Sequence, residues 1–184
     1  VLRSLKPIRG EDVAHLSVRG QYRAGASSGA AVPGYLEELG KPDSRTETFV
    51  ALKAEVDNWR WAGVPFYLRT GKRLAERNAE IIVEFRPTPH HIFPGANRPN
   101  QLVIKLQPED GPELHLAAAK GSSQGEALAP VFLDLDFDKA FAQKRVGAYE
   151  RLLLDALAGR LNLFVRSDEQ EAAWAWVEPI LRAW

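Results

Sequence analysis

Residues 48–56 read TFVALKAEV, and apolar positions alternate along this stretch. Positions 50, 52, 54 and 56 are Val, Leu, Ala and Val, whereas Lys53 and Glu55 lie between them. Successive side chains of a strand point to opposite faces of a sheet, so this period is typical of a strand with one buried and one exposed face. The stretch therefore predicts a half-buried β-strand.

Further short segments with strand character follow this stretch. They are rich in Val, Ile, Leu and Phe, are bounded by Gly, Pro or Asn, and comprise residues 66–69, 79–85, 101–107, 113–118 and 132–137. Most follow one another without a ten-residue helical pattern between them, which disfavours parallel βαβ units and predicts an antiparallel sheet. Residues 1–22 have no clean period, and residues 24–34 have the small-residue composition of a surface loop.

The C-terminal part of the chain predicts two helices. Apolar residues recur at helical spacing over residues 149–157, and Gly159 is a plausible C-terminal stop. Ser167 followed three residues later by Gln170 is the pattern of a capping box that begins a second helix. Pro179 should bend that helix, because an interior proline usually kinks the element. The apolar stripe of the second helix consists of Ala173, Trp176, Val177, Ile180 and Trp184.

These elements predict an α+β fold: a mainly antiparallel β-sheet with helices packed on one face and at the C-terminus. At 184 residues, 45% of them hydrophobic, the chain is long enough to form one domain with a substantial core. It contains no methionine and begins at Val1, which suggests a domain cut from a longer protein.

Composition excludes several classes of function. Twenty-four basic residues balance twenty-four acidic ones, so no overall field would attract nucleic acid or an anionic membrane. The lack of cysteine excludes disulfides and thiolate metal sites, and it fits a cytoplasmic location. No apolar run approaches the roughly 20 residues that span a bilayer, and no leader opens the chain.

The densest cationic feature consists of Arg69, Lys72, Arg73 and Arg77, beside Gly71. Glycine permits backbone angles that other residues resist, so it would let the chain turn and direct Lys72 away from the strand. Two or three charge-assisted hydrogen bonds from such cations would suit a phosphate dianion. The alternative interpretation is a basic loop that faces water.

Common nucleotide motifs are not matched. A Walker loop would need glycine where Phe66 stands and Ser or Thr where Arg73 stands. The glycines of residues 20–34 do not match the G-x-G-x-x-G spacing that binds dinucleotides after a strand. We therefore predict no cofactor-binding residues of these kinds in this chain.

A metal site is not predicted either. Asp134, Asp136 and Asp138 imitate half of a calcium loop, but Lys139 and Arg145 occupy its glycine and glutamate positions. The three aspartates are better interpreted as the exposed face of a strand. The adjacent histidines at 90 and 91 lack the spacing of a zinc pair.

Gln107 is a second candidate for ligand binding. It shares one face of its predicted strand with Lys105, so it would present an amide beside a cation, which suits sugar hydroxyls. The alternative is an exposed polar face of a sheet.

Longer stretches of the chain resemble glucose-6-phosphate dehydrogenase. They are VRGQY (18–22), PGYLEELG (33–40), TETFVAL (46–52), DNWRWAGVPFYLRTGKRL (57–74), LVIKLQP (102–108), AYERLLLDAL (148–157) and FVRSDE (164–169). The resemblance implies that residues 1–184 form the C-terminal substrate-side and dimerisation domain of such an enzyme. The N-terminal Rossmann domain and the peptide with the catalytic histidine are not in this sequence.

The family oxidises D-glucose 6-phosphate to 6-phospho-D-glucono-1,5-lactone with NADP, the first step of the oxidative pentose phosphate pathway. By resemblance, Lys72, Arg77 and Gln107 are the substrate-binding residues of this chain. Lys72 and Arg77 would offset the negative charge of phosphate and sugar oxygens, and Gln107 would hydrogen-bond a hydroxyl. The chain would hold no catalytic residue and be inactive alone, with NADP bound mainly by the absent domain.

The resemblance also bears on a second nucleotide and on assembly. Animal members hold a structural NADP on this domain, but Asn78 and Ile82 stand at two of its basic positions, so we expect no such site. Arg69, Lys105 and Arg166 remain where other cationic contacts would lie. Family members form homodimers or homotetramers through the sheet. The alternative function is a non-catalytic dimerisation and stability module.

Overall fold

The structure, a computed structural model, describes residues 1–27, 29–87, 89–90, 99–108, 110–120, 127–137 and 146–184. The chain divides into two compact units. Unit 1 comprises Val1–Ala75 and Asp155–Trp184, and unit 2 comprises Glu76–Leu154. None of the helices in the described ranges is both long and apolar enough to cross a membrane.

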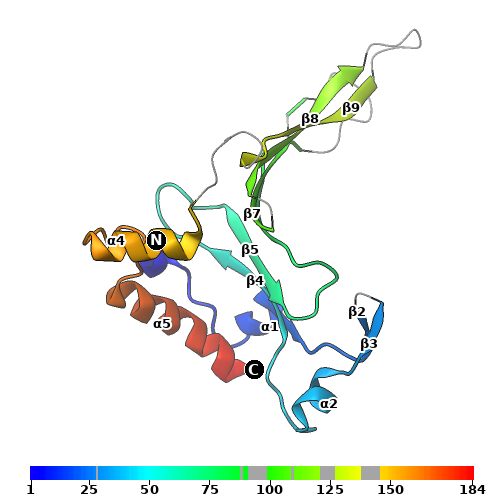
Figure 1. Cartoon of the computed structure of the whole chain (residues 1–184), viewed down its shortest axis with the longest axis vertical. Coiled ribbons are helices and arrows are strands. Elements are labelled where there is room, and N and C mark those ends of the chain that lie inside the picture. The colour runs from blue at the N-terminus through cyan, green and yellow to red at the C-terminus, as the bar shows by residue number, and fades with distance from the viewer. Residues whose placement is uncertain (28, 88, 91–98, 109, 121–126, 138–145) are drawn as a thin grey trace. The chain divides into compact units, whose positions relative to one another are not determined.

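Unit 1 contains a three-stranded antiparallel sheet in the order β1-β4-β5 (Figure 1). Its strands are β1 (Ser17–Gly20), β4 (Phe49–Glu55) and β5 (Pro65–Gly71). The alternation of residues 48–56 predicted the central strand correctly to within one residue at each end. Ala54, in the middle of that alternation, is 2% exposed.

A second, two-stranded sheet lies where the sequence predicted a loop. β2 (Gly25–Ser27) and β3 (Ala30–Val32) form an antiparallel pair and are followed by the short helix α2 (Tyr35–Leu39). The prediction was wrong here because small residues carry no period that separates a buried face from an exposed one. β1 was missed for a related reason: residues 1–22 have no clean alternation.

The core of unit 1 forms where the C-terminal helix meets the N-terminal segment. Ile180 of α5 (Ser167–Ala183) packs with Ile8 and with Val13 of α1 (Asp12–Leu16), and these three side chains are at most 4% exposed. The short helix η1 (Leu2–Ser4) begins the chain and contacts α5. The predicted apolar stripe of α5 is confirmed as the face that closes this core.

Two tryptophans of the same stripe donate hydrogen bonds from their indole N–H groups to the N-terminal part of unit 1. Trp176 Nε1 donates to the carbonyl oxygen of Lys6 at 2.8 Å, and Trp184 Nε1 donates to Ser17 Oγ at 3.0 Å. Both rings are partly buried against the core cluster. The helix is therefore held by apolar burial and by hydrogen bonds from two tryptophans of its stripe.

The N-terminal cap of α5 lies one residue earlier than predicted. Arg166 has an extended backbone, and its N–H donates to Glu169 Oε2 at 3.0 Å. Ser167 is thus the first helical residue. The side chain of Glu169, three residues after Arg166, accepts the hydrogen bond from the N-cap N–H, a role that we had assigned to Gln170. The helix continues through Pro179 to Ala183.

The helix predicted over residues 149–157 is α4 (Ala148–Leu157). Gly159 follows with a φ of 69°, and its N–H donates to the carbonyl oxygen of Ala156, so it is the predicted helix stop. The side chains of Tyr149 and Leu157 are more than four-fifths exposed.

Unit 2 is built on a four-stranded antiparallel sheet in the order β6-β7-β8-β9. Its strands are β6 (Ala79–Glu84), β7 (Gln101–Gln107), β8 (Gly111–Lys120) and β9 (Ala127–Asp134). The fold class and the antiparallel pairing are confirmed. The single sheet that we expected is instead, among the described strands, three separate sheets.

The prediction for β9 was displaced along the chain. We placed a strand at residues 132–137, whereas β9 ends at Asp134 and begins before Pro130. Pro130 was taken as a boundary, but it lies inside the strand opposite Ala117. β9 is an edge strand of the described sheet, and proline is tolerated there because its missing N–H leaves no central ladder bond unmade.

Candidate functional site

Lys72 leaves the unit 1 sheet at the end of its hairpin. The last pair of the β4–β5 ladder joins Phe49 to Gly71, and the backbone N–H of Lys72 donates to the carbonyl oxygen of Thr48 at 2.7 Å. The Lys72 side chain itself is exposed. The sheet therefore fixes the backbone of Lys72 and leaves its ammonium group at the surface.

The role that we gave to Gly71 was wrong. Gly71 is a paired residue of β5 without a left-handed backbone, and the left-handed residue is Arg73, with a φ of 51°. What Gly71 provides is space, because a Cβ there would lie 3.0 Å from Phe49 Cδ2 and 3.2 Å from Leu74 Cδ2. The turn that exposes Lys72 is made one residue after it.

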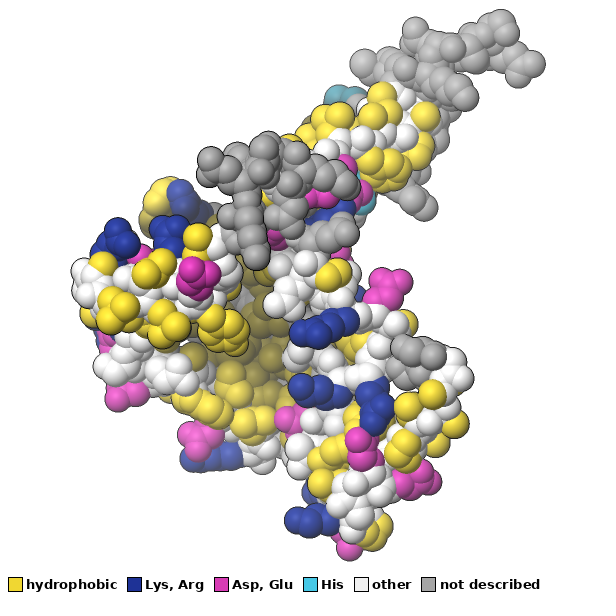
Figure 2. All heavy atoms as spheres, viewed as in Figure 1, with side chains coloured by type: hydrophobic (Ala, Val, Ile, Leu, Met, Phe, Trp, Pro, Cys, Tyr) yellow, Lys and Arg dark blue, Asp and Glu magenta, His cyan; other side chains and the backbone are white. Residues whose placement is uncertain are grey.

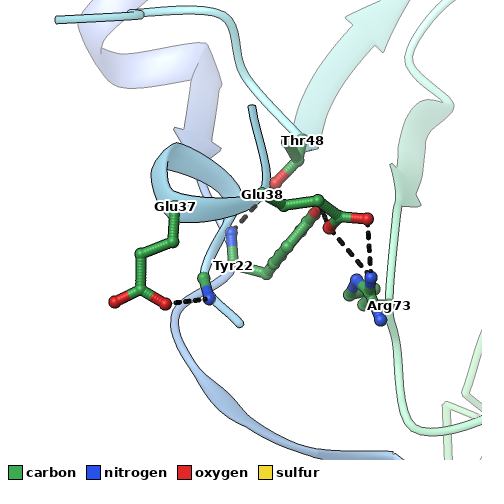
Figure 3. Close-up of polar contacts among 6 residues, drawn as sticks. Tyr22, Glu37, Glu38, Thr48 and Arg73 are labelled. Carbon is green, nitrogen blue, oxygen red and sulfur yellow. Dashed lines mark hydrogen bonds and ion pairs between the residues drawn. The ribbon is translucent and has the colours of Figure 1, made fainter. Parts of the chain in front are cut away.

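Arg73 is held by a carboxylate and an aromatic ring (Figure 3). Its guanidinium nitrogen donates to both oxygens of Glu38, at 2.9 and 2.8 Å, and lies 5.2 Å from the centre of the Tyr22 ring. The Tyr22 hydroxyl donates to Glu38 Oε2 at 2.6 Å. The pKa of Glu38 is lowered first by this hydroxyl and then by Arg73. The charge of Arg73 is therefore neutralised within the chain.

The other cations of the basic cluster are available to a ligand. Arg69, Lys72 and Arg77 are exposed, and within the described part of the chain none of them forms an ion pair. A side chain that already has a carboxylate partner would have to lose it before binding phosphate, and these three would not. Among the described residues, the cluster thus has three cations without a carboxylate partner and one, Arg73, that stabilises the local structure.

Within unit 2, the β6–β7 ladder brings Arg77 and Gln107 to the same end of the sheet. Gln107 is the last residue of β7, and its partner Ala79 lies two residues after Arg77. Both side chains are exposed. Arg77 and Gln107 therefore lie near the same end of the unit 2 sheet, whereas Lys72 lies in unit 1, five residues before Arg77.

The ammonium group of Lys105, near Gln107 on β7, is already paired with carboxylates. Its nitrogen atom is 2.5 Å from Glu113 Oε2 and 3.2 Å from Asp134 Oδ1. The pKa of Lys105 is raised, mainly by its hydrogen bond to Glu113. The carboxylate of Glu113 also lies 2.7 Å from His115 Nε2. Lys105 is thus part of a polar network across β7, β8 and β9.

This network was visible in part from the sequence. Glu113 and His115 are two residues apart on a predicted strand, so they share a face, but the sequence did not show that Lys105 of the neighbouring strand lies on that same face. Tyr22, Glu38 and Thr48 gave no comparable signal. They are far from Lys72 along the chain, and no local pattern joins them.

Two of the three cations that the family resemblance suggests for a second nucleotide site are paired with carboxylates. Arg166 forms an ion pair with Asp168 at 3.0 Å, and Lys105 is held as described above. Arg69 keeps a free guanidinium among the described residues. Two of the three remaining cations would therefore have to give up a carboxylate to bind nucleotide phosphates.

Groups of acidic and histidine side chains do not gather into a metal site within the described ranges. No three of them lie together there, and Asp134 is paired with Lys105. Asp136 follows the end of β9 rather than lying on it. His91 and Asp138 fall outside the described residues.

The sequence and the fold match known proteins over the whole chain. The family model for the glucose-6-phosphate dehydrogenase C-terminal domain matches residues 1–184. Glucose-6-phosphate 1-dehydrogenase of Rhizobium meliloti (strain 1021) is 56% identical over 187 residues, and that of Mycolicibacterium smegmatis (strain ATCC 700084 / mc(2)155) is 50% identical over 187 residues. Each match covers 100% of this chain and 38% of the relative.

Two solved structures have the same fold. A glucose-6-phosphate dehydrogenase in complex with its substrate glucose-6-phosphate superposes with a TM-score of 0.85 at 34% identity, covering 99% of this chain and 36% of that one. Glucose-6-phosphate 1-dehydrogenase from Mycobacterium avium superposes with a TM-score of 0.75 at 37% identity, with the same coverage. The chain thus spans well under half the length of these relatives. It belongs to the family of glucose-6-phosphate dehydrogenase C-terminal domains.

Proposed function

We propose that residues 1–184 form the C-terminal, substrate-side domain of a cytoplasmic, NADP-dependent glucose-6-phosphate dehydrogenase. The whole enzyme would oxidise D-glucose 6-phosphate to 6-phospho-D-glucono-1,5-lactone, the first step of the oxidative pentose phosphate pathway. The observation that carries the proposal concerns the geometry of Lys72. Its backbone is fixed at the end of a hairpin, and its ammonium group has no carboxylate partner among the described residues.

The proposed roles of the binding residues follow from their chemistry. The ammonium group of Lys72 is a compact charge with three donors, and the guanidinium of Arg77 is planar and permanently charged, so both suit the oxygens of a sugar phosphate. Gln107 has an amide that can both donate and accept, which suits a sugar hydroxyl. These residues bind and orient the substrate.

NADP belongs, in this proposal, mainly to the part of the enzyme outside these 184 residues. The chain has no dinucleotide fingerprint, and Lys105 and Arg166 are paired with carboxylates. The residues present here therefore do not fit the phosphates of a nucleotide well. We expect this chain alone to be inactive, because it would lack the hydride acceptor and the general base.

The test is the Michaelis constant of the full-length enzyme for glucose 6-phosphate. A charge-assisted hydrogen bond contributes about 1.5 to 3 kcal/mol, and a factor of ten corresponds to about 1.4 kcal/mol. We therefore expect Lys72→Ala to raise the constant at least tenfold. Lys41→Ala, which removes an exposed lysine elsewhere in unit 1, should leave it unchanged. An unchanged constant in Lys72→Ala would count against the proposal.

A second candidate function, a dimerisation and stability module, is favoured by the surface of unit 2. Ile81 and Leu133 lie on the same face of its sheet and are 50% and 56% exposed. Figure 2 shows apolar side chains over β8 and β9. Apolar side chains grouped on one sheet favour association with another surface. We propose that the enzyme forms a homodimer or homotetramer through this sheet. If the dimer forms and Lys72→Ala has no effect on substrate binding, the module would be the whole function.

A further inference from the structure

The segment that carries Lys72 is held by a closed ring of contacts, most of it drawn in Figure 3. Thr48 joins two parts of the ring: its Oγ1 accepts from the N–H of Tyr22 at 3.0 Å, and its carbonyl oxygen accepts from the N–H of Lys72 at 2.7 Å. Arg73, the next residue, reaches Glu38, which is bonded to the Tyr22 hydroxyl. The ring therefore returns to its starting residue.

Arg73 is an unusual residue for this role. It adopts a φ of 51°, in the left-handed region that residues other than glycine rarely occupy, because their Cβ is crowded there. Such a conformation persists where surrounding contacts hold it. Here the two hydrogen bonds to Glu38 and the Tyr22 ring hold the guanidinium, so these two side chains stabilise the turn that follows Lys72.

The ring is anchored in turn by its neighbours. The Tyr22 ring packs edge-to-face against Tyr35, at 5.7 Å between ring centres, and the Tyr35 N–H donates to the Tyr22 carbonyl oxygen at 3.0 Å. Tyr35 begins the helix α2 that carries Glu38. The carboxylate that holds Arg73 is therefore itself placed by packing and backbone hydrogen bonds.

We propose that Glu38 and Tyr22 are positioning residues: acting through Arg73, they preorganise the Lys72 ammonium group for the sugar phosphate. This inference rests on the proposed function of Lys72. A loop released from the ring would spread Lys72 over many positions, and binding would then include the cost of ordering it again. Because the reacting groups are elsewhere, the effect falls on substrate binding rather than on turnover.

Direct substrate binding is not the role of these side chains. Glu38 carries a negative charge that would repel phosphate, and its pKa is lowered, so it stays ionised at neutral pH. Arg73 is engaged by both oxygens of that carboxylate. The pair is neutral as a unit and acts on the conformation of the segment.

The experiment compares two neighbouring glutamates of α2 in the full-length enzyme. Glu38→Ala should raise the Michaelis constant for glucose 6-phosphate three- to tenfold and leave kcat within twofold. Glu37→Ala removes the same charge from the same helix, but its carboxylate accepts from the N–H of Gly34 at 3.3 Å and does not touch Arg73. This control should keep the Michaelis constant within twofold. An unchanged constant in Glu38→Ala overturns the inference.

Tyr22→Phe separates the hydroxyl from the ring. The phenyl ring stays under the Arg73 guanidinium while the bond to Glu38 is lost, so the Michaelis constant should rise less than in Glu38→Ala. If the Michaelis constant rose more in Tyr22→Phe than in Glu38→Ala, the inference that the Glu38 carboxylate is the main contact holding Arg73 would be overturned.

A double-mutant cycle distinguishes positioning from an independent effect. If Glu38 acts through Lys72, then Glu38→Ala should add less than a twofold rise in the Michaelis constant when Lys72→Ala is already present. Effects that multiply in the double variant would overturn the inference and leave the proposed function of Lys72 standing. If Lys72→Ala itself has no effect, the proposed function fails and this inference fails with it.

Hydrogen exchange of the Lys72 amide shows, in the absence of substrate, whether the ring of contacts holds the Lys72 segment in place. That amide donates to Thr48 in the intact ring, so Glu38→Ala should speed its exchange at least tenfold, whereas Glu37→Ala should not. Equal exchange rates in Glu38→Ala and wild type would show that the ring does not hold the segment, whatever the kinetics of Lys72→Ala. The two failures are thereby distinguishable.

Discussion

The two units contain similar strands but differ in how they bury apolar side chains. In unit 1, Ile8, Val13 and Ile180 are at most 4% exposed, because α5 closes over the N-terminal segment. In unit 2, Val103, at 7% exposed, is the one buried apolar side chain among the described residues, whereas Leu133 is 56% exposed. Unit 1 therefore has a hydrophobic core of its own, whereas the sheet of unit 2 exposes its apolar residues.

The two units therefore depend on different forces for their stability. Burial of apolar surface is the dominant stabilising term of a folded domain, and unit 1 uses it. The described sheet of unit 2 relies on its backbone ladder and on the ion pairs of Lys105. A sheet with exposed apolar side chains gains stability when another surface covers it.

Ile180→Ala should produce the largest loss of stability. Ile180 is 1% exposed at the centre of the unit 1 core, and removing a buried Ile side chain costs about 2–5 kcal/mol because it leaves a cavity. We expect a fall of about 3 kcal/mol in the free energy of unfolding, measured by urea denaturation. The control Leu181→Ala removes the 40% exposed neighbour and should cost much less. Equal losses would show that α5 does not close a core.

Leu133→Glu should weaken association with little change in folding. Leu133 lies exposed on β9, and a charge in an apolar interface must be desolvated without a partner. We expect the dissociation constant of the proposed dimer, measured by sedimentation, to rise at least tenfold, or about 1.4 kcal/mol. Val18→Glu changes a residue of similar exposure, 62%, on the unit 1 sheet. If both variants weaken the dimer equally, the interface is not specific to unit 2.

Acid should weaken unit 2 through Glu113. Its pKa is lowered, first by the hydrogen bond from Lys105, so its contribution to stability is fully present above the ordinary value of 4.5. That contribution is lost as the pH falls through the lowered pKa. Thermal melting between pH 3 and 6 should show a smaller pH dependence in Glu113→Gln than in wild type. Identical slopes would contradict a stabilising role for this ion pair.

Trp59→Ala should have the smallest effect on the stability of this chain. Trp59 is 91% exposed at the tip of the β4–β5 hairpin, and surface substitutions usually change stability by about 0.5 kcal/mol or less. Trp176→Ala is the matched comparison, because that ring packs on the core and donates to Lys6. A loss in Trp59→Ala as large as in Trp176→Ala would mean that the hairpin tip is buried in solution.

Much of the fold was predictable, and the failures have physical causes. β4 and β7 have strong apolar character and clear ends, so their bounds came out nearly correct. β2 and β3 were missed because alanine, glycine and serine leave no period to detect. β9 was predicted to start at Phe132, after Pro130, because the sequence does not show that the strand lies at an edge where proline is tolerated.

The candidate site was predictable in part. Resemblance pointed to Lys72, Arg77 and Gln107, and the pairing of Gln107 with Ala79 brings two of these residues to one end of a sheet. The roles of Gly71 and Arg73 could not be read from the sequence. A glycine that is needed for space and a glycine that is needed for an unusual φ cannot be distinguished in the amino-acid sequence.

The sequence by itself determined the α+β class, the strands with a clear period and the family, because each depends on patterns within a short stretch. The tertiary structure decided which cations have a carboxylate partner among the described residues. Arg73 is neutralised by Glu38, 35 residues earlier, and Lys105 by Glu113 across a strand pair. Partners that meet through the fold leave no mark in local spacing, so their charges could be assigned only in three dimensions.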